Sequence, residues 1–330
     1  MWNKNFSSHF INNFDHLQNR SQFSLQKCFL TTSENPSDLE QKKIDSLFLL
    51  APSDVGVIRN GGRRGALWGP EALLNYLQKA TIQNTPMILA KILVTSLENE
   101  QENFEESQRA QAQSILKAIS SQELSGPGIL PHFHLGGGHD HFYSLSKALL
   151  AHPQVKKILV INLDPHLDTR NDSLAHSGTP FRQLAKKAQE VQKKVDCIQW
   201  GTALFCNPKS SYEEVDNHFY NSKIWNEKKQ SLISYLNLLK LEEGQYVILS
   251  LDCDIINSSL MEAVSAPAWT GVDLGEIEKI IISYLELMTR HHLRPFIGIY
   301  EYNPLFDNLS MKGAKGICSL IYKALTFNYY

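Results

Sequence analysis

Two aspartates and one histidine occupy alternate positions directly after an apolar run. In the stretch ILVINLDPHLDTR (158–170), Asp164, His166 and Asp168 follow five aliphatic residues and Asn162. Because side chains at i, i+2 and i+4 of an extended chain point to one side, these three groups would converge at the end of a buried strand. Ligand sites of open α/β sheets lie at the carboxyl ends of strands. Taken alone, the triplet is compatible with a metal site or with a polar loop that caps the next helix.

Two further segments carry the same kinds of side chain. Asp252 and Asp254 end the apolar run YVILSLDCDIIN (246–257), and His139 follows three glycines in HFHLGGGHDHF (132–142). The glycine run lacks the spacing of a phosphate-binding loop. Each segment alone is compatible with turn aspartates or a structural histidine. Carboxylates gathered at one edge of a sheet, however, are costly to desolvate unless a cation pairs with them, so we predict a shared metal centre.

The charge of this set indicates how many ions it holds. The four aspartates carry −4 and two divalent cations bring +4, so a pair of ions neutralises the set. Oxygen and imidazole ligands without thiolate suit Mn²⁺ better than a structural zinc. Two neighbouring ions lower the pKa of a bridging water and generate a nucleophile. The sequence therefore predicts two Mn²⁺ ions per chain, held by His139, Asp164, His166, Asp168, Asp252 and Asp254.

The composition argues against several classes of protein. The 330 residues carry 32 basic and 34 acidic side chains, a net charge of −2, and 42% of them are hydrophobic. A nucleic-acid binder needs a strongly basic surface, so we expect no such partner. Five scattered cysteines without a CxxC pair favour a reducing compartment. Without a signal-peptide pattern or an apolar run of about 18 residues, we expect a cytoplasmic protein with a small-molecule substrate and no membrane contact.

Strands and helices are expected to alternate along most of the chain. Aliphatic runs that suit parallel strands buried on both faces occur at 46–51, 87–96, 129–137, 156–164, 197–203, 223–226, 246–254 and 295–302. Helical patterns occur at 69–79, 102–121, 141–151, 180–193, 227–240 and 273–291. This alternation predicts a single three-layer α/β/α domain with right-handed crossovers and a mostly parallel sheet of about eight strands.

The first 45 residues differ from the rest of the chain. Phe6, Phe10, Phe14 and Leu17 recur at helical spacing, and a polar stretch then leads to Pro36. We expect an N-terminal extension over 1–45, which is either a surface helix docked on the main domain or an arm that binds a partner. The metallohydrolase domain is expected over 46–330.

The metal motifs also carry a family resemblance. GGGHD (136–140), DPHLD (164–168) and SLDCD (250–254) resemble the three metal motifs of the ureohydrolase (arginase/agmatinase) superfamily. The resemblance narrows to the formimidoylglutamase branch through GVIRNGGRRGALWGPEAL (56–73), HSGTPFRQL (176–184), VSAP (264–267) and YEYNPLFD (300–307). It implies an arginase-like fold over roughly residues 46–325. It also implies that one ion is bound by His139, Asp164, Asp168 and Asp252, and the other by Asp164, His166, Asp252 and Asp254.

This resemblance implies a hydrolase that acts on linear amidines. The reaction would convert N-formimidoyl-L-glutamate and water to L-glutamate and formamide, a step of histidine degradation. A hydroxide that bridges the two ions would attack the formimino carbon, with Asp254 as a proton acceptor. Glu301 would accept a hydrogen bond from the formimino nitrogen, and His176 would pass a proton to the leaving amine.

The substrate also carries two carboxylates, which require cations and hydrogen-bond donors. A planar guanidinium suits this task because it forms two parallel hydrogen bonds to a carboxylate. Arg170, close after Asp168, is a further candidate for a carboxylate contact. The predicted substrate-binding residues are Arg59, Asn60, Arg63, Ser177 and Glu301.

Two other functions remain open. A guanidino hydrolase of the agmatinase or arginase type would share the metals but prefer a cationic substrate, which the arginine-rich turn and Ser177 disfavour. A non-catalytic metal-binding relative is suggested by departures from the family pattern between Asn257 and Ala263, where Glu262 and Ala263 replace proline and glycine. Relatives are often oligomeric, so a homo-oligomer is possible, but no sequence feature specifies an interface.

Overall fold

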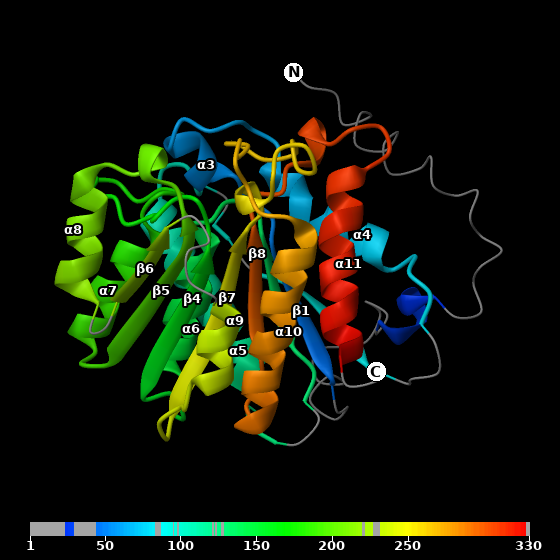
Figure 1. The fold of residues 1–330 in the computed structure, drawn as a ribbon, viewed down its shortest axis with the longest axis horizontal. Helices are drawn as coiled ribbons and strands as arrows, with labels where there is room; N and C mark the ends of the chain where they lie inside the picture. Colours follow the sequence, from blue (N-terminus) through cyan, green and yellow to red (C-terminus); the bar gives the residue numbers. More distant parts are fainter. Residues whose placement is uncertain are drawn as a thin grey trace.

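An eight-stranded parallel sheet runs through the middle of the molecule (Figure 1). The computed structural model describes residues 24–29, 44–82, 87–94, 96–97, 99–120, 122, 124–126, 129–219, 222–226 and 232–327. Within these ranges the strand order is β2-β1-β3-β8-β7-β4-β5-β6, and every neighbouring pair is parallel. The predicted parallel α/β sheet is therefore confirmed.

Each strand falls on one of the predicted aliphatic runs. The strands are β1 (Ser46–Ala51), β2 (Leu89–Leu93), β3 (His132–Gly136), β4 (Lys157–Leu163), β5 (Lys194–Thr202), β6 (Ser222–Asn226), β7 (Gln245–Asp252) and β8 (Phe296–Tyr300). All residues of β1, β3, β4, β7 and β8 are buried. Helices cover both faces of these strands, which explains why their sequences are nearly continuous in apolar residues rather than alternating.

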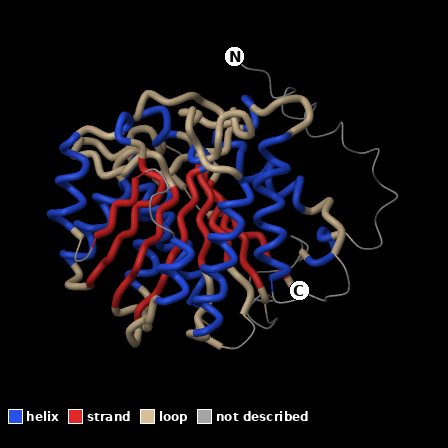
Figure 2. Tube along the Cα trace, in the orientation of Figure 1, coloured by secondary structure: helices blue, strands red, loops and turns tan. Residues whose placement is uncertain are grey.

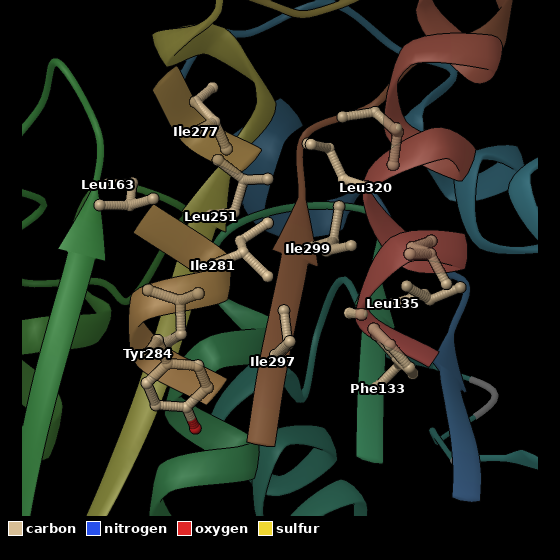
Figure 3. Packing of buried hydrophobic residues seen from close by; sticks show 14 of the residues in the cluster. Phe133, Leu135, Leu163, Leu251, Ile277, Ile281, Tyr284, Ile297, Ile299 and Leu320 are labelled. Atoms are coloured by element: carbon tan, nitrogen blue, oxygen red, sulfur yellow. The ribbon is translucent and has the colours of Figure 1, made fainter. Parts of the chain in front are cut away.

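Helices form the two outer layers, and Figure 2 shows the strands between them. One face of the sheet packs against α4 (Gly69–Leu77), α9 (Leu232–Leu238), α10 (Leu274–Arg290) and α11 (Lys312–Thr326). The other face packs against α5 (Phe104–Ser120), α6 (His141–Ala151), α7 (Pro180–Glu190) and α8 (Lys209–His218). In Figure 3, Ile281 and Tyr284 of α10 lie over Leu251 of β7 and Ile297 of β8. The three-layer architecture is thus built from two apolar cores, one on each side of the sheet.

Three helices of the structure were not predicted from the sequence. The structure adds α3 (Val55–Arg59), which lies in a segment that we expected to be a glycine-rich turn, and it adds α8 and α11. In α11 the buried side chains of Ile317, Leu320, Ile321 and Ala324 follow helical spacing, but Gly313 and Gly316 weaken the helical propensity of the segment. Helix α8 is largely polar, so its hydrophobic periodicity is weak.

Residues 24–29 pack directly against the main domain. Leu25–Cys28 form a short 3₁₀ helix, in which Leu25 is fully buried and its backbone N–H donates to Ala80 O at 2.8 Å. Phe29 forms a parallel bridge with Leu89 of β2. This part of the predicted extension therefore contributes to the core. The helix expected from Phe6 to Leu17 lies outside the described residues.

The structure also bears on the expectations about thiols and membranes. The thiols of Cys28, Cys197, Cys206, Cys253 and Cys318 are all free. Among the helices within the described ranges, none is long and apolar enough to cross a bilayer.

Candidate metal centre

Four consecutive strands of the sheet carry predicted site residues at their carboxyl ends. In the order β3-β8-β7-β4, the loops after these strands hold His139, Glu301, Asp254 and Asp164 respectively, and Asp252 is the last residue of β7. These ends meet at the upper edge of the sheet, where Figure 2 shows the loops gathered. Segments more than 100 residues apart in sequence therefore converge on one small volume.

The first cluster centres on His139. Its Nδ1 lies 3.0 Å from Asp164 Oδ2, 2.9 Å from Asp168 Oδ2 and 3.1 Å from Asp252 Oδ2. The His139 side chain is only 1% exposed and the Asp168 side chain 12%, so this cluster is largely shielded from water. Three carboxylates directed at one imidazole nitrogen form a set that can hold a metal ion. These four residues are those assigned to one ion from the sequence.

The second cluster shares Asp164 with the first. His166 Nδ1 lies 3.1 Å from Asp254 Oδ2 and 3.4 Å from Asp164 Oδ1. Asp164 therefore directs one carboxylate oxygen to each histidine, as expected of a bridging ligand. Asp252 directs Oδ2 at His139, and its Oδ1 accepts a hydrogen bond of 2.9 Å from the Asp254 backbone N–H, just as Asp164 Oδ1 accepts one of 2.7 Å from the His166 backbone N–H. In this structure Asp252 contributes to the first cluster, and the second consists of Asp164, His166 and Asp254.

The pKa shifts of these residues indicate that bound cations would stabilise the two clusters. Burial disfavours the charged form of His139, but hydrogen bonds with Asp164, Asp168 and Asp252 outweigh it and raise its pKa well above the usual range. Burial, together with the charge of Asp252, raises the pKa of Asp254 well above its usual range. Within the described part of the chain, Asp254 Oδ1 is buried without a hydrogen-bond partner. Divalent cations would relieve both the repulsion and the desolvation, so the donor set fits the metals that the sequence predicted.

Three further residues contact His139 and hold it in place. The ring of Tyr300 stacks on the imidazole, with centroids 5.0 Å apart and an interplanar angle of 24°. Ser250 Oγ lies 2.8 Å from His139 Nε2, and Glu301 Oε1 accepts a bond of 3.1 Å from the His139 backbone N–H. Sequence reasoning missed Ser250 and Tyr300. Ser250 lies two positions before Asp252 on the same strand, so strand periodicity is the signal that places both on one face.

Glu301 combines burial with an uncommon backbone conformation. Its φ is +66°, a region in which residues other than glycine are rare, so the surrounding structure must enforce it. Glu301 Oε2 is buried and has no hydrogen-bond partner among the residues that the structure describes. Burial and the charge of Asp252 raise the pKa of this carboxyl group well above its usual range. The conformation therefore directs an unpaired acceptor into the region of the metal centre.

The predicted substrate-binding residues differ in what they contact. Asn60, which caps the C-terminus of α3, donates from Nδ2 to Ser177 Oγ at 3.1 Å. Arg59 donates to the carbonyl oxygens of Ala175 (3.2 Å) and Gln101 (2.7 Å). The structure therefore joins Asn60 and Ser177, whereas it uses the guanidinium of Arg59 to tie loops together.

The Arg63 guanidinium is also engaged by the protein itself. Arg63 donates from Nη2 to Val264 O and, at 3.3 Å, to Glu262 O. Its Cζ lies 3.9 Å from the centroid of the Phe306 ring. The loop in which Glu262 and Ala263 depart from the family pattern is therefore fastened to the turn that carries Arg63.

His176 is enclosed in its own loop. Its Nδ1 accepts a hydrogen bond of 3.1 Å from the Gly178 backbone N–H, so Nε2 carries the proton and donates to Asp172 Oδ2 at 2.7 Å. Only 7% of the side chain is exposed. In this conformation both ring nitrogens have partners, so a proton transfer by His176 would first require the bond with Asp172 to break.

A cavity of about 250 Å³ opens beside the second cluster. His166, Ala203, Phe205, Cys206 and Trp269 are among the residues that line it. Phe205 and Trp269 are 77% and 84% exposed, so the mouth of this cavity is aromatic. A small molecule that enters here reaches His166 directly.

The fold and the site define a class before any relative is considered. This is a three-layer α/β protein in which two acid–imidazole clusters, each able to hold a metal ion, share one aspartate at the carboxyl edge of the sheet. The model of the arginase family matches residues 45–326. The chain therefore belongs to the arginase family.

Relatives in sequence and in structure agree with this assignment. The chain is 29% identical over 289 residues to a formimidoylglutamase of Cupriavidus pinatubonensis, a match that covers 82% of this chain and 84% of the relative. A structure of Trypanosoma cruzi formiminoglutamase with Mn²⁺ superposes with a TM-score of 0.71, at 24% identity, over 92% of this chain and 98% of that one. Bacillus subtilis formimidoylglutamase gives a TM-score of 0.72 at 18% identity, over 94% and 93% of the two chains. The structural likeness shows the arginase-like fold that was expected from sequence.

Proposed function

We propose that this protein hydrolyses N-formimidoyl-L-glutamate to L-glutamate and formamide with the help of two Mn²⁺ ions. The observation that carries the proposal is the pair of acid–imidazole clusters joined through Asp164, in a chain whose curated relatives are named formimidoylglutamase. Mn²⁺ is chosen because a structural neighbour contains it and because the donors are carboxylate oxygens and imidazole nitrogens. Free thiols at all five cysteines support a reducing, cytoplasmic location.

Six side chains would hold the two ions. His139, Asp168 and Asp252 would bind the first, His166 and Asp254 would bind the second, and Asp164 would bridge them. Bound divalent cations supply an activated water molecule and polarise the carbon–nitrogen double bond under attack. With an ion bound, Ser250 would fix the histidine tautomer, because a hydrogen bond donated from His139 Nε2–H to its hydroxyl leaves Nδ1 free to coordinate.

The remaining groups would orient the substrate and move protons. Glu301 Oε2, buried and unpaired, would accept a hydrogen bond from the formimino nitrogen and hold the amidine head in place. Asp254 Oδ1, also unpaired, would accept the proton of the attacking water. His176 would deliver a proton to the leaving amine as an imidazolium, so its Nδ1 must first release the Gly178 N–H and take up the second proton, and its bond with Asp172 must open. These roles need no serine or cysteine nucleophile.

A substrate panel tests this proposal. Metal-stripped protein reloaded with Mn²⁺ should be offered N-formimidoyl-L-glutamate, agmatine and arginine, with formamide, ammonia and urea measured separately. We expect formamide from the first substrate in amounts equal to the glutamate released. Faster turnover of agmatine or arginine would assign the protein to the guanidino hydrolases instead, and turnover of none of the three would favour a non-catalytic relative.

A further inference from the structure

Two of the arginines near the centre, Arg59 at the end of α3 and Arg63 in the turn that follows, are committed to contacts within the protein. The Arg59 guanidinium donates hydrogen bonds to the carbonyl oxygens of Ala175 and Gln101, and its Cζ lies 4.6 Å from the centroid of the Phe104 ring. Arg63 bonds the carbonyl of Val264 and stacks on Phe306. Both guanidinium groups fasten loops, and a substrate carboxylate would have to displace these contacts.

Arg170 is held in a different way. Its Nη1 donates to Asn60 Oδ1 at 2.6 Å, and its backbone N–H donates to Gly178 O at 3.0 Å. The stem of Arg170 crosses Gly178 so closely that a Cβ there would lie 3.3 Å from Arg170 Cδ. An amide oxygen, rather than a carboxylate, therefore orients the exposed guanidinium, which keeps its full charge and further N–H donors.

The neighbours of Arg170 connect it to the metal centre and to the candidate substrate residues. It follows the ligand Asp168 by two positions, and the φ of +50° at Asp168 turns the chain just before it. Asn60 joins Arg170 to Ser177, because its Oδ1 accepts from the guanidinium and its Nδ2 donates to the Ser177 hydroxyl. The Ser177 oxygen accepts that bond, which leaves its own O–H as a donor.

We propose that Arg170 recognises a carboxylate of the substrate and that Asn60 is the positioning residue that aims it. This inference rests on the proposed function, since it names the group that selects an anionic amidine. The planar guanidinium can bind a carboxylate through two parallel N–H donors. An exposed cation near the centre also attracts an anionic substrate.

Paired substrates test the assignment. Arg170→Met and the wild type should be compared on N-formimidoyl-L-glutamate and on N-butylformamidine, which keeps the amidine head but lacks both carboxylates. We expect Arg170→Met to lower kcat/KM about 100-fold for the first substrate, mainly through KM. For the second substrate the change should stay within about threefold. Arg170→Lys should recover roughly a tenth of the wild-type value, because an ammonium group cannot form the paired bonds.

Two further variants separate positioning from simple loss of charge. Asn60→Ala should lower kcat/KM for N-formimidoyl-L-glutamate by about 3- to 10-fold, the effect of one hydrogen bond, and should have no further effect in the Arg170→Met background. Arg109→Met is the matched control, because Arg109 is an exposed arginine on α5 that pairs with Glu106. Equal losses on both substrates in Arg170→Met, or altered Mn²⁺ content, would overturn the proposal.

Binding of L-glutamate, measured by calorimetry on the Mn²⁺-loaded protein, keeps this test independent of turnover. If the wild type binds L-glutamate and Arg170→Met binds it at least tenfold more weakly, the assignment of Arg170 holds even if no hydrolysis is found. If the wild type hydrolyses N-formimidoyl-L-glutamate but Arg170→Met binds L-glutamate equally well, the proposed function holds and the assignment of Arg170 fails. If the wild type binds no L-glutamate, the assignment is likewise overturned.

Discussion

Ser250→Ala should weaken the binding of one of the two proposed ions, although Ser250 is a ligand of neither. Ser250 is fully buried on β7, and its Oγ lies 2.8 Å from His139 Nε2. For His139 Nδ1 to coordinate an ion, Nε2 must carry the proton, and its N–H then donates a hydrogen bond to this hydroxyl. Alanine removes the acceptor and leaves a buried N–H without a partner, while the rest of the side chain and the strand are unchanged.

Two independent scales give a similar magnitude for this change. A buried donor that loses its partner costs about 1–3 kcal/mol. Removal of an outer group that orients a metal-bound histidine lowers metal affinity by about 10- to 100-fold, which corresponds to roughly 1.4–2.7 kcal/mol. His139 belongs to the first cluster alone. We therefore expect the weaker-binding ion of the variant to be the one held by His139, with the other changed by less than about threefold.

Titration with Mn²⁺ in a chelator buffer, read by elemental analysis, measures both affinities. Ser146→Ala is the control, because Ser146 is also a buried serine but donates within α6 to Tyr143 O at 3.1 Å. Chemical denaturation of the metal-free proteins then separates metal affinity from stability. If Ser250→Ala lost folding stability but bound both ions as tightly as the wild type, the hydroxyl would only support the fold and the reasoning would be refuted.

Three other substitutions and a change of pH probe the centre and the fold around it. Asp164→Asn should weaken both ions in the same titration, whereas Asp254→Asn should weaken one. Gly137→Ala should cost roughly 1–3 kcal/mol of unfolding free energy in denaturant, because its Cβ would lie 2.0 Å from Ser53 O. The raised pKa values of His139 and His166 stabilise the metal-free fold below about pH 6.5, and this contribution is lost as pH rises through those values. Ionisation of Asp254 adds repulsion in the same direction, so the gain in Tm from Mn²⁺ should grow between about pH 5 and pH 8, and a shrinking gain would contradict this.

The strands and the convergence of the acids could be predicted because local signals determine them. A run such as that of β4 is apolar at nearly every position, and parallel strands necessarily bring their carboxyl ends to one edge. Asp164, His166 and Asp168 follow that run at alternate positions, so their convergence requires only an extended chain. Helix α11 was missed although its apolar side chains are periodic, because two glycines obscure its helical propensity.

The roles of the arginines could not be predicted in this way. A guanidinium on a long, flexible stem bonds whichever acceptors the tertiary structure brings within reach. Arg59 and Arg63 meet carbonyl oxygens from loops more than 40 and 190 residues away, and nothing beside them in sequence indicates this. The turn that suggested a carboxylate clamp thus serves partly to join loops, and Arg170 is an exposed arginine whose guanidinium is oriented by an amide oxygen instead.

The place of Glu301 follows from an order of strands that differs from their order in sequence. Strand β8 is last along the chain but lies between β3 and β7 in the sheet, so the residue after it emerges between His139 and Asp252. That position accounts both for its bond to the His139 backbone and for the influence of Asp252 on its pKa. A left-handed backbone conformation at a buried acid is costly, and it is retained where the neighbouring contacts enforce it. Here those contacts are the ones that hold the first cluster, so the geometry of the proposed amidine acceptor and the geometry of the metal ligands depend on the same few residues.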